Sequence, residues 1–242
     1  CIRDRCISLR VLRQAQTSLA QLVANGSIDS GVEGLLRGIV DKRASFLVTG
    51  GTGSGKTTLL AALLGCVPAT ERLLIIEDTP ELAPAHPHVV TLVSRRANAE
   101  GRGEISMSLL LRQALRMRPD RIVVGEIRGA EVVELLAALN TGHDGGAGTV
   151  HANSVDEVPA RMEALAALGG LDRVALHSQL AAAVHVVLGM ERGSEGRRLA
   201  HIGVLEGNPV RPRLVWTADG GAAAGVGRLR AGRGGQAACG GI

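Results

Sequence analysis

The feature that most constrains this chain is a glycine-rich octapeptide, GGTGSGKT, at residues 50–57. It fits the pattern GxxxxGK[ST] and lies between an apolar run over 46–48 and a helical pattern over 57–64. In that setting the glycines let backbone N–H groups converge on phosphate oxygens, and the helix N-terminus adds its positive end. The motif therefore predicts a strand, a loop and a helix that together bind the phosphates of a nucleotide.

The residues of this loop have expected roles. Lys56, one of only two lysines in the chain, is expected to reach the β- and γ-phosphates, and the Thr57 hydroxyl is expected to bind Mg²⁺. The expected ligands are ATP and Mg²⁺. The predicted nucleotide-binding residues are Gly50, Gly51, Thr52, Gly53, Ser54, Gly55, Lys56, Thr57 and Thr58.

Apolar runs alternate with helical patterns along most of the chain. Runs typical of buried strands cover 46–48, 73–76, 89–93, 122–124, 149–151 and 184–188. Helical patterns separate most of them, and one that begins after Asp29 or Ser30 carries its apolar residues on one face. This alternation predicts an α/β fold with a mostly parallel sheet, and the runs 199–205 and 210–216 predict a small antiparallel element.

Polar residues follow the predicted strands at the edge where parallel sheets bind ligands. Hydrolysis of a nucleotide needs an acid that supports the metal and a group that orients water. Glu126, after the strand at 122–124, is the candidate metal-supporting acid. Glu77 and Asp78 are candidate bases for water, although Asp78 can instead cap the turn that follows. His151 ends a strand of the same series and is predicted to sense the γ-phosphate.

Composition and charge exclude some other functions. Aromatic residues make up only 1% of the chain, which excludes a stacking platform for single-stranded nucleic acid. The net charge of +4 is scattered along the sequence, so we attribute it to solubility and do not expect a nucleic-acid partner. No run of 18 apolar residues occurs, so no transmembrane segment is expected.

These motifs, in this order, resemble the secretion ATPase family of type II and type IV secretion, which includes VirB11-like and pilus motor ATPases. The resemblance covers roughly residues 8–190 and is nearest to the Flp/Tad pilus branch. The segments that carry it are GGTGSGKTTLL (50–60), IIEDTPEL (75–82), NAEGRGE (98–104), LRQALRMRPDRIVVGEIRGAEVVELL (111–136), NTGHDG (140–145) and TVHANS (149–154).

The resemblance implies a RecA-like P-loop fold and Mg²⁺-dependent ATP hydrolysis. It implies that Lys56 and Thr57 belong to the Walker A motif, that Glu77 is the catalytic glutamate, and that Glu126 is the metal-supporting Walker B acid. It places His151 in the family's His box. The residues that match arginines of the family's arginine-containing segments, and are expected to act in catalysis, are Arg95, Arg116, Arg118 and Arg128.

The resemblance also implies an assembly and a location. The family forms hexameric rings in the cytoplasm that dock beneath an inner-membrane platform. Residues 1–25 are expected to be the last piece of the family's N-terminal domain, which normally completes the ring contacts. The ATPase domain is expected over 26–216, and the Gly/Ala-rich residues 217–242 are expected to form a disordered tail.

We therefore expect a subunit of a motor that powers a Tad/Flp-type pilus or a type II/IV secretion machine. A conjugation-type secretion ATPase remains open. So does an inactive nucleotide-binding scaffold, although the presence of Lys56, Glu77, Glu126 and His151 together argues against it. A DNA-translocating ATPase is a third alternative, for which the scattered basic charge gives weak support.

Overall fold

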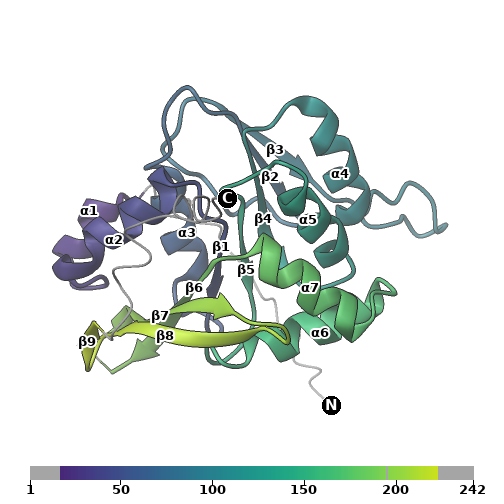
Figure 1. Cartoon of the computed structure of the whole chain (residues 1–242). Helices are drawn as coiled ribbons and strands as arrows, with labels where there is room; N and C mark the ends of the chain where they lie inside the picture. Colours follow the sequence, from purple (N-terminus) through teal and green to yellow (C-terminus); the bar gives the residue numbers. More distant parts are fainter. Residues whose placement is uncertain (1–16, 195, 223–242) are drawn as a thin grey trace, which may run out of the picture.

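A mixed sheet of nine strands organises the chain, in the order β3-β2-β4-β5-β1-β6-β7-β8-β9. The computed structural model describes residues 17–194 and 196–222 (Figure 1). The strands are β1 Phe46–Thr49, β2 Leu73–Glu77, β3 Val89–Val93, β4 Arg121–Ile127, β5 Ala147–Val150, β6 Val186–Gly193, β7 Gly196–Glu206, β8 Arg211–Thr217 and β9 Gly221–Ala222.

The strands from β3 to β6 are parallel, and β7, β8 and β9 add an antiparallel end to the same sheet. Every residue of β1, β2 and β5 is buried, as expected for parallel strands covered by helices on both faces. The predicted α/β fold with a parallel sheet and a late antiparallel element is therefore confirmed.

Helices cover both faces of the sheet and divide the core into two parts (Figure 1). On one face lie α1 Leu19–Ala24, α2 Ser30–Asp41 and α3 Lys56–Leu64; on the other lie α4 Met107–Ala114, α5 Glu131–Asn140, α6 Val158–Leu168 and α7 Arg173–Ala183. A short 3₁₀ turn, η1 Leu115–Met117, extends α4. No helix in the described part of the chain is long and apolar enough to cross a membrane.

The structure corrects the predicted boundaries around β5. The sequence predicts a strand over 149–151, but β5 begins two residues earlier and runs from Ala147 to Val150. Glycine is needed at its start because a Cβ on Gly146 would lie 2.3 Å from Leu139 Cδ2. A Cβ on Gly148 would lie 3.1 Å from the Val124 carbonyl oxygen of β4. Close packing against neighbouring elements, and not a loop, explains these glycines.

Both ends of the described chain pack onto the domain. Residues 17–25 contain α1, whose Leu19 and Leu22 are buried in the same core as α2 and α3. The tail was expected to be unstructured from residue 217, but β9 pairs with Trp216 and Thr217 of β8. That expectation is wrong for residues 217–222, and residues 1–16 and 223–242 lie outside the described part.

A buried arginine, Arg121, ties elements together at the end of the sheet where the parallel strands begin, opposite the end that carries the glycine loop. Arg121, the first residue of β4, is 1% exposed. Its Nε lies 2.6 Å from Glu71 Oε2, and its Nη2 donates to the Val40 carbonyl oxygen at 3.0 Å. Because both partners belong to other elements, this ion pair ties β4 to α2 and to the segment before β2.

We predict that Arg121→Ala lowers the free energy of unfolding by roughly 3 kcal/mol, because it leaves the largely buried Glu71 carboxylate without its main cation. Urea unfolding of the two chains measures this difference. Arg37→Ala is the control, since Arg37 forms an exposed pair with Glu33 that contributes at most about 1 kcal/mol. Equal losses in the two variants would contradict the assignment.

Candidate nucleotide-binding site

The glycine loop joins β1 to α3 in a conformation that only glycine adopts readily. Gly50, Gly53 and Gly55 have φ values of 143°, 71° and 100°. At Gly50 space is also lacking, because a Cβ would lie 2.2 Å from the Met190 carbonyl oxygen of β6. The loop therefore keeps its shape through backbone freedom and through close contact with the neighbouring strand.

Lys56 is the first residue of α3 and is buried within the loop. Its Nζ donates to the carbonyl oxygens of Gly50 and Gly51 at 2.9 and 3.0 Å. Burial lowers the pKa of the Lys56 ammonium, and the charge of Glu126 opposes that shift. The predicted metal-supporting acid therefore acts electrostatically on the loop lysine and favours its charged form.

Several polar atoms at the loop fit a phosphate and metal ligand. The Ser54 hydroxyl is buried without a hydrogen-bond partner, which leaves a polar group directed into the loop. The residues described contain no cluster of three or more His, Cys, Asp or Glu side chains that could hold a metal. A Mg²⁺ ion at this site would therefore be held mainly by the nucleotide phosphates, and Thr57 and Glu126 are the candidate protein ligands, in keeping with the few protein ligands that this ion usually has.

Glu77 ends β2 and is almost fully buried. Its Oε1 accepts hydrogen bonds from the N–H groups of Glu81 and Leu82 at 3.1 and 3.0 Å, while its buried Oε2 has no partner. Burial raises the pKa of Glu77, and these two N–H groups lower it. A carboxylate with one fixed and one unpaired oxygen is suited to accept a proton from water.

Glu77 and Glu126 lie on adjacent strands. A Cβ on Gly125 would lie 2.6 Å from Glu77 Cγ, so the glycine before Glu126 makes room for the Glu77 side chain. Glu126 itself forms an ion pair with Arg128, whose guanidinium also contacts Asp78 at 3.1 Å. Arg128 thus bridges the ends of β2 and β4, and Asp78 pairs with it in place of capping the following turn.

His151 follows β5 and contacts the glycine loop directly. Its Nε2 lies 3.0 Å from the Thr52 hydroxyl. The Thr49 hydroxyl, at the end of β1, donates to the Ala152 carbonyl oxygen at 3.0 Å and holds the same two strand ends together. The predicted neighbourhood of His151 and the phosphate loop is therefore present, and its role as a γ-phosphate sensor stays a prediction.

Three of the four predicted arginines do not join this site within one chain. Arg95 is exposed after the edge strand β3, where its Nε donates to the Gly103 carbonyl oxygen at 2.8 Å. Arg116 and Arg118 are exposed just before β4 begins, at the opposite end of that strand from Glu126. Only Arg128 meets the acidic residues, and a catalytic role for any of the four stays a prediction.

Sequence reasoning missed Glu131, which shapes the segment after β4. This carboxylate is buried in the first turn of α5 and accepts hydrogen bonds from the N–H groups of Arg128 and Gly129 at 2.7 and 2.8 Å. An acid in the first turn of a helix is a recognisable capping signal. It holds Arg128 where its side chain reaches Glu126.

Comparisons with known proteins identify the family of the chain. The family described as Type II/IV secretion system protein matches residues 1–192. A protein of Mycobacterium tuberculosis (strain H37Rv) named for conjugal transfer is 66% identical over 220 residues, which cover 89% of this chain and 62% of that protein. The conjugal transfer protein TrbB of Rhizobium radiobacter is 35% identical over 175 residues, covering 71% of this chain and 51% of that protein.

Among solved structures, the VirB11 ATPase of the Brucella suis type IV secretion system, in complex with sulphate, superposes with a TM-score of 0.63. Its sequence is 27% identical, and the match covers 81% of this chain and 64% of that one. The chain belongs to the type II/IV secretion ATPase family, whose members are ATP-binding P-loop enzymes. These relatives are named for conjugal transfer and type IV secretion and do not single out the Flp/Tad branch. The chain spans less than two thirds of their length.

We predict that Gly50→Ala lowers the melting temperature by an amount equivalent to about 2 kcal/mol, because it combines a positive φ with the contact to the Met190 carbonyl oxygen. Gly51→Ala is the matched control for stability, since no atom lies within 4 Å of the position of its Cβ. Thermal unfolding compares the two. A Gly50→Ala chain as stable as Gly51→Ala would mean that the loop lacks this close contact.

Proposed function

We propose that this chain hydrolyses ATP with Mg²⁺ and that the hydrolysis powers a conjugation-type type IV secretion machine. The observation that carries the proposal is that Lys56, Glu77, Glu126 and His151 lie at one edge of the sheet, at the ends of neighbouring strands. The conjugal transfer names of the two relatives above favour this machine.

The side chains divide the work in this proposal. Lys56 would leave the carbonyl oxygens of its own loop and donate to phosphate oxygens, and the Thr57 hydroxyl and Glu126 would hold the metal. The metal, when bound, neutralises negative charge on the β- and γ-phosphates. Glu77 accepts the proton of the attacking water through its unpaired oxygen. Glu126 must first exchange its ion pair with Arg128 for that role.

We also propose that the chain works as part of a hexameric ring at the cytoplasmic face of the inner membrane, beneath platform proteins of the machine. The exposure of Arg95, Arg116 and Arg118 away from their own glycine loop supports action on a neighbouring subunit. Arginines supplied in trans stabilise transition-state charge in other P-loop enzymes.

A Tad/Flp-type pilus motor is the second candidate. The six motif segments between residues 50 and 154, whose resemblance is nearest to that branch of the family, favour it. Both candidates use the same ATPase site and differ in the machine that receives the work.

We predict that Lys56→Ala lowers ATP hydrolysis by roughly 10²–10³-fold, because it removes a cation that contacts the transferring phosphoryl group. Lys42→Ala is the matched control: it removes the only other lysine, an exposed residue at the C-terminus of α2, and should keep the wild-type rate. Phosphate release in the presence of Mg²⁺ measures both. An unchanged rate in Lys56→Ala would refute the proposed site.

We predict that Glu77→Gln lowers turnover by roughly 10²–10⁴-fold, as expected on loss of a positioned base. Burial raises the pKa of Glu77, and a base must be deprotonated to act. The wild-type rate should therefore rise with pH, and the midpoint of this rise should lie above the pKa of an exposed glutamate. Glu77→Gln should lose this rise of the rate with pH. The control is Glu206→Gln, which removes an exposed carboxylate paired with Arg213 and should keep the same rise of the rate with pH.

Glu77→Gln should lower turnover but raise the stability of the folded chain at neutral pH. A raised pKa in the folded state means that stability is lost as pH rises through that pKa. Glu77→Gln should therefore melt at a higher temperature than the wild type at neutral pH, with no such gain below the pKa of an unfolded-state glutamate. A lower melting temperature of Glu77→Gln at neutral pH would contradict the claim that burial disfavours the charged form of Glu77.

A further inference from the structure

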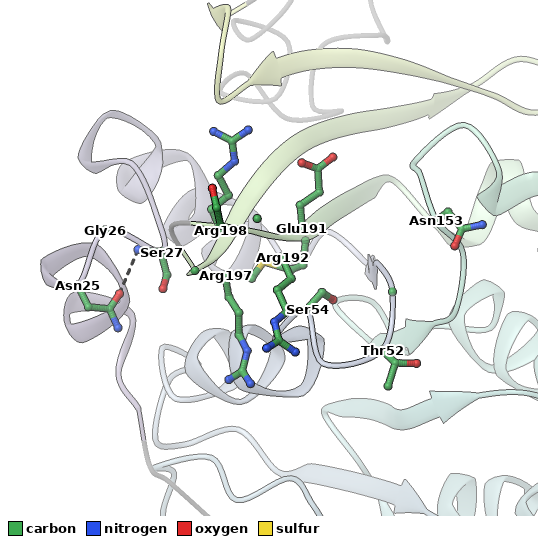
Figure 2. Close-up of a pocket in the computed structure, with 15 residues that line it drawn as sticks. Asn25, Gly26, Ser27, Thr52, Ser54, Asn153, Glu191, Arg192, Arg197 and Arg198 are labelled. Atoms are coloured by element: carbon green, nitrogen blue, oxygen red, sulfur yellow. Dashed lines mark hydrogen bonds between the residues drawn. The ribbon is translucent and has the colours of Figure 1, made fainter.

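A pocket of about 1010 Å³ opens beside the glycine loop (Figure 2). One wall is the turn between α1 and α2, at residues 25–27, and the floor includes Gly51, Thr52 and Ser54 of the loop. The remaining wall is the hairpin formed by β6 and β7, which contributes residues on both of its strands. The roles derived so far use only the Met190 carbonyl oxygen of this hairpin and none of its charged side chains.

The hairpin carries two cross-strand pairs of charged residues on opposite faces. Arg192 is paired with Arg197, and the next pair along is Glu191 with Arg198. Side chains of successive pairs point to opposite faces of a sheet. Figure 2 shows Arg192 and Arg197 side by side and directed toward the glycine loop, while Glu191 and Arg198 point away from it.

The outer face carries charges of opposite sign, since Glu191 is paired with Arg198 across the two strands. Arg198 contacts Asp219 at 2.9 Å, and Glu191 lies 3.6 Å from His201 Nδ1. On the loop face, the guanidinium groups of Arg192 and Arg197 form no ion pair or hydrogen bond with any residue that the structure describes. Like charges placed directly opposite each other destabilise a strand pair, so this face gains from an anion.

Both arginines lie next to the phosphate loop. A Cβ on Gly53 would lie 3.6 Å from Arg192 Nη1, and a Cβ on Gly55 would lie 3.4 Å from Arg197 Cδ. Met190, two residues before Arg192, sets this approach because its carbonyl oxygen abuts Gly50. The glycines thus leave the loop open on the side from which the guanidinium groups approach.

We propose that Arg192 and Arg197 bind the phosphate chain of the nucleotide from the hairpin side, opposite the backbone N–H groups of the loop. This inference rests on the proposed nucleotide site and adds two binding residues to it. A guanidinium group offers planar, paired donors that match phosphate oxygens. The bound phosphate would also remove the repulsion between the two cations.

The test is a fluorescence titration of the full chain with a mant-labelled ATP and Mg²⁺, followed by displacement with inorganic pyrophosphate. We expect Arg192→Gln and Arg197→Gln each to weaken mant-ATP binding by roughly tenfold, the scale of one charge-assisted hydrogen bond. Pyrophosphate displacement should weaken by a similar factor. Arg198→Gln removes the same charge from the outer face of the same hairpin and should change binding by less than about twofold.

A melting curve without nucleotide shows that the variants fold. Arg192→Gln should not lower the melting temperature, because it removes one of two facing like charges. Unchanged binding in both loop-face variants would overturn the proposal, and so would equal weakening in Arg198→Gln. Weakened mant-ATP binding with unchanged pyrophosphate displacement would also overturn it, since the arginines would then contact the nucleoside.

The variant Lys56→Ala distinguishes a failure of the proposed nucleotide site from a failure of the arginine proposal. If the wild type binds mant-ATP and Lys56→Ala does not, the nucleotide site stands and the arginine variants decide the inference alone. If the wild type fails to bind, the proposed function and the inference fall together.

Discussion

The parallel pairing of β1 with β5 on one side and β6 on the other is the constraint on which the site depends. It brings the glycine loop between His151 at the end of β5 and Met190 in β6. The order β2-β4-β5-β1 then places Glu77 and Glu126 further along the same edge. Residues that are far apart in the sequence therefore meet because parallel strands end together.

Keeping Lys56 and Glu77 charged in the folded state lowers the stability of the chain, as the direction of their pKa shifts indicates. Burial lowers the pKa of Lys56 and raises that of Glu77, so it disfavours the charged form of both residues. The loop carbonyl oxygens and two backbone N–H groups compensate in part. Strained or poorly compensated groups of this kind are common at functional sites. The buried Arg121–Glu71 pair, at the opposite edge, has no such incomplete pairing.

Much of the fold follows from local patterns in the sequence. The apolar face of α2 is buried as its helical spacing predicts, with Asp29 as the cap through a hydrogen bond to the Gly31 N–H. The acidic and histidine residues were found because they follow buried strands. The start of β5 was missed because glycines chosen for close packing give the same signal as a loop.

The contacts of the arginines could not be predicted, because they depend on which strands become neighbours. Arg128 meets Glu126 and Asp78 only through the β2–β4 pairing, and Arg192 reaches the glycine loop only through the β1–β6 pairing. Local periodicity carries no information on strand order. A dense run of arginines in the sequence therefore does not indicate which of them face the nucleotide.

The central claim is that the glycine loop is the phosphate site and that Lys56 changes partners on binding. A crystal structure of the chain with Mg²⁺ and a non-hydrolysable ATP analogue tests it most directly. The account predicts phosphates enclosed by residues 50–57, with Lys56 Nζ moved from the Gly50 and Gly51 carbonyl oxygens to a phosphate oxygen. An analogue bound elsewhere, with Lys56 still bonded to its own loop, would contradict the account.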